Sequence, residues 1–172
     1  VPWRQPTVWA DYDAVVIRST WDYQDDPAAF LSVLSRIEAD GVPLHNGHDV
    51  VRWNLQKTYL RDLAARGVPV VPTIWRDSLA PSTLSELFAA LGADEIVVKP
   101  VVGANAGGAY RLARADDAAR RDEVETYYAA RALMAQPFVP AVTAEGEFSL
   151  FYFGGVHSHA VLKTPKAADF RV

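Results

Sequence analysis

Apolar and polar residues follow two periodicities along the chain. Short runs rich in β-branched residues at 14–17 and 95–100 are typical of buried strands. Between them, apolar residues recur every three or four positions over 27–40, 57–66 and 84–91, which predicts three amphipathic helices. Because strands and helices alternate in this way, the pattern predicts a mixed α/β (α+β) fold.

Residue types that favour helix ends mark the expected limits of these helices. Asp26 and Asn54 are expected N-caps, because their side chains can accept hydrogen bonds from the first free N–H groups of a helix. Gly41, Gly67 and Gly92 follow the last apolar position of each helix, where glycine readily adopts the left-handed conformation that ends a helix.

The last third of the chain predicts a surface helix at 116–134, extended chain at 135–140 and a β-hairpin at 147–163. Two prolines in the extended segment predict irregular pairing, which leaves main-chain groups free for a ligand. The hairpin turns at two adjacent glycines, and its alternation predicts a half-buried antiparallel pair. Its expected apolar face consists of Phe148, Leu150 and Tyr152.

Composition restricts the classes of function. The 172 residues are 50% apolar and 22% charged, which is typical of a globular protein. The net charge of -4 argues against a broad basic surface for nucleic acid or anionic lipid. No run approaches the ~20 apolar residues of a membrane span, and no signal peptide is recognisable, so we expect a cytoplasmic protein without nucleic-acid or membrane partners.

The potential metal ligands are few and scattered. The chain has no cysteine, which excludes disulfides, thiolate nucleophiles and zinc–thiolate sites. His45 and His48 are expected in loops, and His157 and His159 share a strand face without a third ligand nearby. We therefore assign no metal ligand in this sequence.

Lysine is unusually rare, with four lysines against thirteen arginines. Lys57 falls in the first turn of a predicted helix, whereas Lys99 and Lys163 each end a predicted strand. A compact ammonium group suits a phosphate oxygen that is approached as a point charge. For the strand-end lysines taken singly, simple exposure to solvent is the alternative.

The segment after Lys99 contains Gly103, Gly107 and Gly108 among small residues. Glycine-rich main chain can approach a phosphate closely and direct several N–H groups at it. The pattern is neither a Walker A motif nor a dinucleotide-binding G-x-G-x-x-G. Lysine followed by this loop predicts a cover over a triphosphate, and an ordinary flexible connection is the alternative.

Other polar residues suit the remaining parts of a nucleotide and a second substrate. Glu147 could accept hydrogen bonds from ribose hydroxyls, and the main chain at 136–139 could meet an adenine edge. A solvated acid is the alternative for Glu147. The polar residues after the first predicted strand lie where open α/β sheets place ligand-facing loops.

Six segments, taken in order, resemble the ATP-grasp family. They are 54–60, 67–73, 97–100 with the glycine loop, 136–139, 146–149 and 169–171. The segments 17–23 and 52–54, with His-Ser-His-Ala ahead of Lys163, resemble the glutathione-synthetase-like branch that includes a cycloserine-forming cyclo-ligase. The resemblance covers essentially the whole chain.

The resemblance implies a partial ATP-grasp fold with a remnant of a Rossmann-like pre-ATP-grasp domain. Residues 1–50 would form the substrate-side domain, 51–140 the N-lobe with the glycine loop, and 141–172 the start of the C-lobe. The implied ATP-binding residues are Lys57, Lys99, Gly103, Gly107, Gly108, Gln136, Phe138, Val139 and Glu147. Lys163 and Arg171 would be catalytic cations near the transferred phosphate, and Arg18, Ser19 and Thr20 would face the acceptor substrate.

The implied activity is that of an ATP-dependent ligase forming C–N bonds. A small amino-acid-like carboxylate would react through an acyl-phosphate with an amine or related nucleophile. The family's Mg²⁺ ligands are expected beyond residue 172, and the start without Met suggests an internal piece of a longer protein, inactive alone. A non-catalytic nucleotide-binding module and a small-molecule kinase are the alternatives, and a homo-oligomer is one way to cover apolar surface of a truncated sheet.

Overall fold

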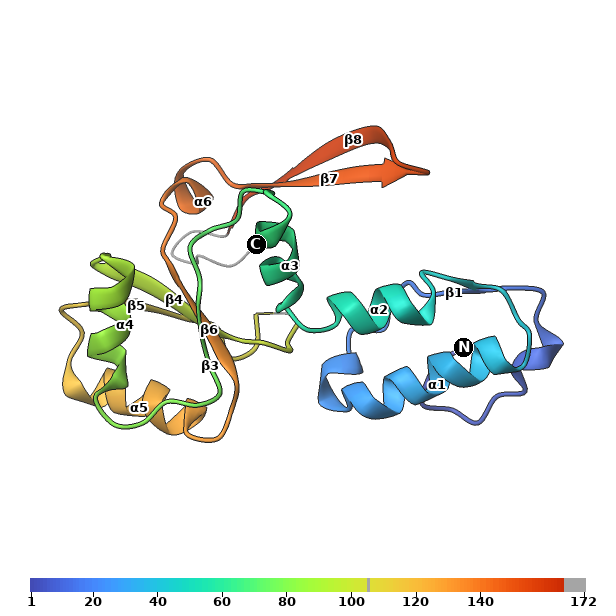
Figure 1. Cartoon of the computed structure of the whole chain (residues 1–172), viewed down its shortest axis with the longest axis horizontal. Helices are drawn as coiled ribbons and strands as arrows, with labels where there is room; N and C mark the ends of the chain where they lie inside the picture. The colour runs from blue at the N-terminus through green and yellow to red at the C-terminus, as the bar shows by residue number, and fades with distance from the viewer. Residues whose placement is uncertain (105, 166–172) are drawn as a thin grey trace. The chain divides into compact units, whose positions relative to one another are not determined.

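The computed structural model describes residues 1–104 and 106–165, and it divides into two compact units (Figure 1). The first unit comprises Val1–Val70 and Pro100–Gly108. The second comprises Val71–Lys99 and the chain from Ala109 onward. The glycine loop therefore belongs to the first unit, although it lies far along the sequence from the rest of that unit.

Helix α1, Pro27–Ala39, organises the first unit. The Asp26 carboxylate accepts a hydrogen bond from the Ala29 N–H at 3.0 Å, and proline occupies the first turn, so the predicted helix start is confirmed. Its buried side chains pack with residues distant in sequence. The core of this unit consists of Trp3, Trp9, Phe30, Leu34, Ile37, Val42 and Leu55.

The remaining elements of the first unit are short. Strand β1 is shorter than predicted and pairs in parallel with a strand that the sequence did not predict. The elements are the 3₁₀ helices η1 (Trp9–Asp11) and η2 (Tyr23–Asp25), the strands β1 (Val15–Val16) and β2 (Leu44–His45), and the helices α2 (His48–Asn54) and α3 (Tyr59–Ala65).

Two predictions in this unit are wrong. Asn54 ends α2 and does not cap a helix, and Lys57 lies between α2 and α3, because its N–H donates to the distant Val101 carbonyl at 2.9 Å. His45 and His48 are not loop residues, since His45 lies in β2 and His48 begins α2. Short elements of this kind depend on tertiary contacts that local sequence does not reveal.

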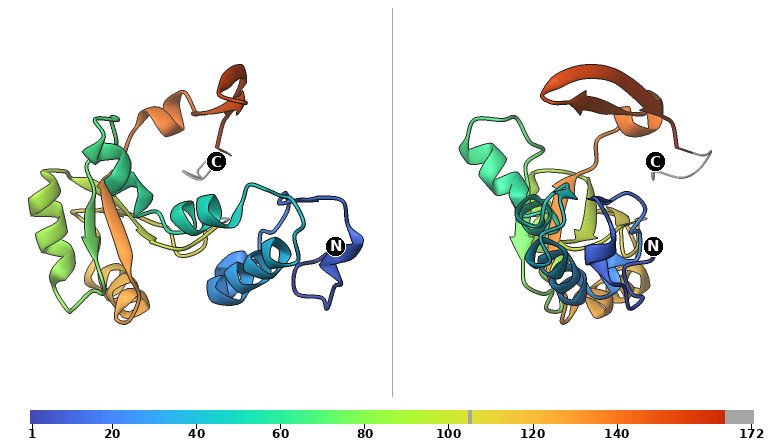
Figure 2. Two further views of the ribbon diagram at one scale, coloured as in Figure 1. Left: turned by 45° about the vertical axis from the view of Figure 1, so that its right-hand side comes forward. Right: turned by 90° about the vertical axis from the view of Figure 1, so that its right-hand side faces the viewer.

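The second unit contains a four-stranded sheet with two helices on one face (Figure 2). The strand order is β3-β6-β4-β5, with β3 antiparallel to β6 and β4 antiparallel to β5. Apolar residues of both helices and of the sheet form one buried cluster. The elements are β3 (Ile74–Arg76), α4 (Thr83–Leu91), β4 (Glu95–Pro100), β5 (Tyr110–Ala113), α5 (Ala118–Tyr128) and β6 (Leu133–Pro137).

The structure confirms α4 and β4 but corrects the region after them. The predicted helix at 116–134 ends at Tyr128, because the chain from Leu133 onward forms the buried strand β6. This strand pairs on both sides, contrary to the expected irregular pairing at 135–140. The prolines do not interrupt it, since Pro137 is its last residue and Pro140 lies beyond it.

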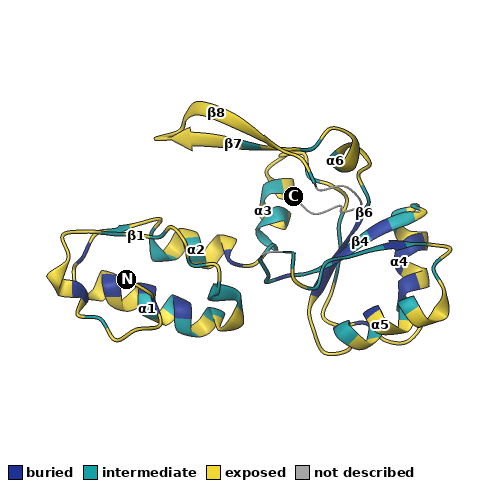
Figure 3. Ribbon diagram, turned by 180° about the vertical axis from the view of Figure 1, so that it is seen from behind, coloured by how far each residue is buried: buried dark blue, intermediate teal, exposed yellow. Residues whose placement is uncertain are grey.

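A short helix α6 (Ala141–Ala144) leads into the hairpin of β7 (Glu147–Phe153) and β8 (Val156–Lys163). The two-glycine turn is confirmed, with positive φ angles at Gly154 and Gly155. The prediction of a half-buried pair is wrong, because every residue of the two strands except Ser149 is exposed in the described part of the chain (Figure 3). No described helix is long and apolar enough to cross a membrane.

Candidate nucleotide site and substrate pocket

Lys57 and the glycine loop lie together in the first unit. The Lys57 ammonium donates a hydrogen bond to the Gly103 carbonyl at 2.8 Å, and the Lys57 N–H donates to the Val101 carbonyl at 2.9 Å. Val101 is buried and Val102 packs against the core of the unit. The loop is thus anchored at its start, and one of the predicted phosphate-binding lysines lies directly on it.

The loop backbone has little room for side chains at its anchored end. A Cβ atom at Gly103 would lie 2.8 Å from Cγ of Pro100, which is too close, whereas at Gly107 it would meet only the Ala104 carbonyl at 3.6 Å. Gly108 has a φ of 70°, in the left-handed region. Ala106 has a φ of 54°, an uncommon conformation for a residue with a side chain. Glycine is therefore required at 103 and favoured at 108.

Lys99 lies near the end of β4 in the second unit. Strand alternation places it on the sheet face opposite to Ile96 and Val98, which pack against the helices. Burial lowers the pKa of Lys99 by more than the charge of Glu147 raises it. No described carboxylate lies within ion-pair distance of its ammonium. A poorly hydrated cation of this kind favours an anionic ligand.

Glu147 and Lys163 face each other at the base of the hairpin. The two residues are directly paired in the register of β7 and β8, and their charged atoms lie 3.2 Å apart. Both side chains are about half exposed. The predicted ribose ligand and the predicted catalytic lysine therefore form an ion pair with each other in this structure.

The predicted adenine-facing segment has more internal partners than the sequence suggests. The Gln136 side chain is buried and donates to the Thr73 hydroxyl at 2.9 Å. The Phe138 N–H donates to the Glu95 carbonyl at 2.9 Å, and the Arg111 guanidinium stacks 3.7 Å from the centre of the Phe138 ring. The expectation of free main-chain groups is thus wrong for the Phe138 N–H, because pairing of the chain continues beyond Pro137.

Val139 is exposed, and its carbonyl accepts a hydrogen bond from Val142 at 3.1 Å. Arg171, the last predicted catalytic residue, lies outside the described residues. Within 1–104 and 106–165, no group of three or more acidic or histidine side chains is placed to hold a metal ion. These residues thus provide no fit for magnesium, and we assign it no ligand.

Arg18, Ser19 and Thr20 line a cavity of about 520 Å³ in the first unit. The wall contains two arginines, two hydroxyl groups and one carboxylate, together with apolar side chains. Arg18 has no hydrogen-bond or ion-pair partner among the residues that the structure describes. The remaining lining residues are Val1, Pro2, Trp3, Arg4, Val16 and Asp22.

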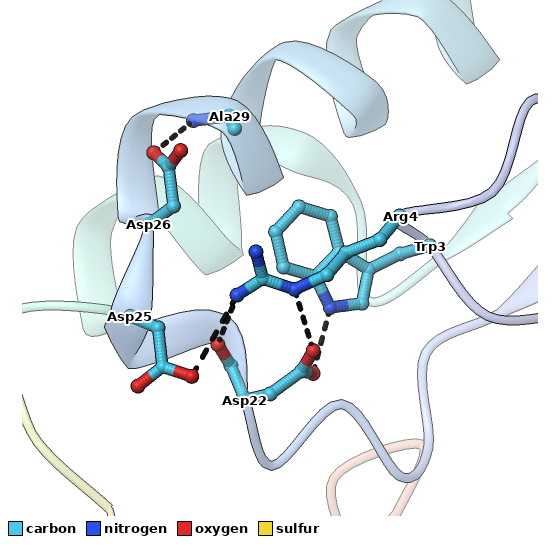
Figure 4. Close-up of polar contacts among 6 residues, drawn as sticks. All are labelled: Trp3, Arg4, Asp22, Asp25, Asp26 and Ala29. Carbon is cyan, nitrogen blue, oxygen red and sulfur yellow. Dashed lines mark hydrogen bonds and ion pairs between the residues drawn. The ribbon is translucent and has the colours of Figure 1, made fainter.

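A polar cluster fixes one wall of this cavity (Figure 4). The Asp22 carboxylate accepts hydrogen bonds from Trp3 Nε1 at 2.7 Å and from Arg4 Nε at 2.8 Å. Arg4 also donates to the Asp22 carbonyl at 3.1 Å and lies 3.7 Å from the Asp25 carboxylate. The hydrogen bonds from Trp3 and then Arg4 lower the pKa of Asp22.

Sequence reasoning did not identify Trp3 and Arg4 as part of this wall. Both lie 18 or 19 residues before Asp22, so no local motif joins them to it. The resemblance pointed to 17–23 as a segment, and that segment provides much of the lining. Charged and hydroxyl side chains around one cavity can orient a small polar ligand that carries both charges.

The chain has measurable similarity to known proteins. Residues 1–46 match the family model of the D-cycloserine synthetase DcsG N-terminal domain. The cycloserine biosynthesis protein DcsG of Streptomyces lavendulae is 37% identical over 166 residues, which is 94% of this chain and 55% of that protein. This chain thus spans about half the length of that curated relative.

Solved structures extend the comparison. The crystal structure of D-cycloserine synthetase DcsG has a TM-score of 0.80 and 34% identity, and the match covers 94% of this chain and 56% of that chain. A RimK-domain ATP-grasp protein from Sphaerobacter thermophilus has a TM-score of 0.50 and 21% identity, over 66% of this chain and 42% of that chain. At 21% identity the second similarity concerns the fold alone.

Proposed function

We propose that this chain, which is a homologue of the cycloserine biosynthesis protein DcsG and has a partial ATP-grasp fold, is the ATP- and substrate-binding part of an ATP-dependent ligase. The observation that carries the proposal is the Lys57 ammonium held 2.8 Å from a carbonyl of the glycine loop. A cation and a flexible main chain at one place can bind a polyphosphate. The domain limits at residues 50 and 140 stay a prediction.

In the first unit, Lys57 and the glycine loop are proposed to bind ATP phosphates. Lys57 would exchange the Gly103 carbonyl for a phosphate oxygen, since the phosphate is the stronger acceptor. The residues 103, 107 and 108 leave space for phosphate close to the main chain. Arg18, Ser19 and Thr20 are proposed to bind the second substrate in their cavity.

In the second unit, Lys99 is proposed to neutralise phosphate charge, which its partly desolvated position favours. The Glu147 carboxylate would separate from Lys163 and accept hydrogen bonds from the ribose hydroxyls. The Lys163 ammonium would then be available to bind a phosphate. The adenine edge would contact main-chain groups of 136–139 other than the Phe138 N–H, which already donates to the Glu95 carbonyl.

The proposed reaction joins a small amino-acid-like carboxylate to an amine-type nucleophile. A carboxylate oxygen attacks the γ-phosphorus of ATP, ADP leaves, and an acyl-phosphate forms; the nucleophile then attacks the acyl carbon and inorganic phosphate leaves. No enzyme nucleophile is needed, so the protein contributes positioning and charge neutralisation. Because the described residues provide no metal cluster, we derive no step through magnesium.

Substitution of Lys57 by alanine tests the nucleotide site. We expect Lys57→Ala to weaken ATP binding at least about tenfold, because a charged hydrogen bond to phosphate is lost. Tryptophan fluorescence titration with ATP measures this affinity. Arg66→Ala is the matched control, since Arg66 is exposed and lies at the end of α3. Unchanged ATP affinity in Lys57→Ala would contradict the proposal.

Product analysis of the full-length protein tests the reaction. Incubation with ATP and a panel of amino acids should release phosphate and form a new C–N bond, which mass spectrometry detects. A phosphorylated product without that bond would indicate a small-molecule kinase on the same fold. ATP binding without turnover of any amino acid would indicate a nucleotide-binding module.

A further inference from the structure

We propose that Gln24 is a positioning residue that fixes the orientation of the glycine loop. Its side-chain oxygen accepts a hydrogen bond from the Ala104 N–H, across 80 residues of sequence. The inference rests on the proposed function, because it assigns Gln24 to the loop that would bind ATP phosphates.

The contact is specific to one peptide group. The peptide bond between Gly103 and Ala104 accepts from the Lys57 ammonium through its carbonyl and donates to Gln24 through its N–H. Because a trans peptide directs these two groups in opposite directions, the two side chains hold the peptide plane from both sides. Rotation of this plane would break both hydrogen bonds.

The two contacts differ in what happens when a phosphate binds. Lys57 would leave the Gly103 carbonyl to reach the phosphate, so the first contact is lost in the bound state. The contact of Gln24 uses the N–H of Ala104 and needs no such exchange. Gln24 is then the side chain that keeps this peptide oriented, and it limits the conformations that the loop must lose on binding.

Gln24 itself is held by the wall of the substrate cavity. It lies in η2, between Asp22 and Asp25, whose carboxylates both contact Arg4. Its side chain is half-buried, and the Asp25 N–H donates to the Asp22 carbonyl at 3.2 Å. A ligand that displaces this wall would therefore also displace the acceptor of the Ala104 N–H, which links occupation of the cavity to the loop.

The test compares substitutions that remove or keep the acceptor oxygen. Gln24→Met retains the length of the side chain without the acceptor, whereas Gln24→Glu retains an acceptor. In the full-length protein without nucleotide, hydrogen exchange of a peptide covering 101–108 is expected to rise about fivefold in Gln24→Met, as for loss of one hydrogen bond. It should stay near the wild-type rate in Gln24→Glu. Gln5→Met at an exposed position is the control.

ATP binding provides the second measurement. We expect Gln24→Met to raise the Kd for ATP about fivefold, with little change in kcat once ATP is saturating. If Gln24→Met fails to fold, Gln24→Ala is measured in the same way. Unchanged exchange in a folded variant without the acceptor overturns the role of Gln24. Raised exchange with unchanged ATP affinity in both Gln24→Met and Lys57→Ala overturns the proposed function instead.

Discussion

Asp22 shows how a single charged residue is held in a cavity wall by one neutral and one charged donor. Asp22 accepts hydrogen bonds from the indole of Trp3, which is buried, and from Arg4, which is exposed. The hydrogen bond from Trp3, the neutral donor, lowers the pKa of Asp22 more than the hydrogen bond from Arg4 does. The position of Asp22 therefore depends on hydrogen-bond geometry more than on distant charges.

Substitution of Asp22 by asparagine should reveal this contribution through its pH dependence. The pKa of Asp22 is lowered from 3.8 in the folded chain, so its stabilisation is complete above that value and is lost as the pH falls through the lower folded value. We expect Asp22→Asn to melt at a lower temperature than wild type near neutral pH, and the difference to shrink below pH 3.8. Thermal melts over a pH series measure it.

Asp13→Asn is the control for that experiment, because Asp13 is exposed and outside the cluster. A difference in melting temperature that stays constant from neutral to acid pH would show that the charge of Asp22 is not the stabilising feature.

Residue type alone supports only part of the proposed site. The rarity of lysine drew attention to Lys57 and Lys99, and the density of small residues to the glycine loop. Trp3, Arg4 and Gln24 could not be found in this way, because each acts through a partner that the folded chain brings from a distant position. Tryptophan, arginine and glutamine are also too common in other roles to mark a site.

Among the elements, the sequence predicted best the longer helices that have a recognisable cap. Helices α1 and α4 carry apolar residues at helical spacing and have a recognisable cap or a terminal glycine. Strands β2, β3 and β5 have two to four residues, and their pairing is set by the tertiary fold. The hairpin and its two-glycine turn were predicted correctly. Strand alternation alone did not predict that both strands are largely exposed in the described part of the chain.

The glycine loop gives a prediction at this scale. Gly103→Ala should destabilise the chain by about 1 to 3 kcal/mol and weaken ATP binding, because its Cβ would meet the rigid ring of Pro100 at 2.8 Å. Gly107→Ala is the matched control for stability alone, since its Cβ would make an ordinary contact at 3.6 Å, although Gly107 belongs to the proposed phosphate site. Urea unfolding and ATP titration measure both. Equal stability of the two variants would argue against steric restriction at 103.

For the molecule as a whole, the division into units does not follow the order of the sequence. Pro100–Gly108 belongs to the first unit, although it follows β3, α4 and β4 of the second unit in the sequence. Val101 is 8% exposed, and Val102 packs against the same core as Leu55. The stability of the first unit thus depends on residues encoded after much of the other unit.

Truncation of Val101 measures that dependence. We expect Val101→Ala to lower the free energy of unfolding of the first unit by about 1 to 3 kcal/mol, because a buried side chain is lost. Tryptophan fluorescence reports on this unit, which holds Trp3, Trp9, Trp21 and Trp53. Val68→Ala, at an exposed position of the same unit, should have little effect. An equally small effect at both positions would disprove the dependence.

The anchoring of the loop on Lys57 also bears on how the protein is made. During translation, residues 1–70 leave the ribosome before Val101 does. The N–H and the ammonium of Lys57 therefore cannot bond to the carbonyls of Val101 and Gly103 until these later residues emerge. The seven core residues of the first unit all lie before Val70, but the packing of Val102 on this core and the two contacts of Lys57 cannot form until the loop has emerged. A ribosomal pause before residues 101–108 have left the exit tunnel would therefore leave these contacts unformed, whereas a pause after they have emerged would not.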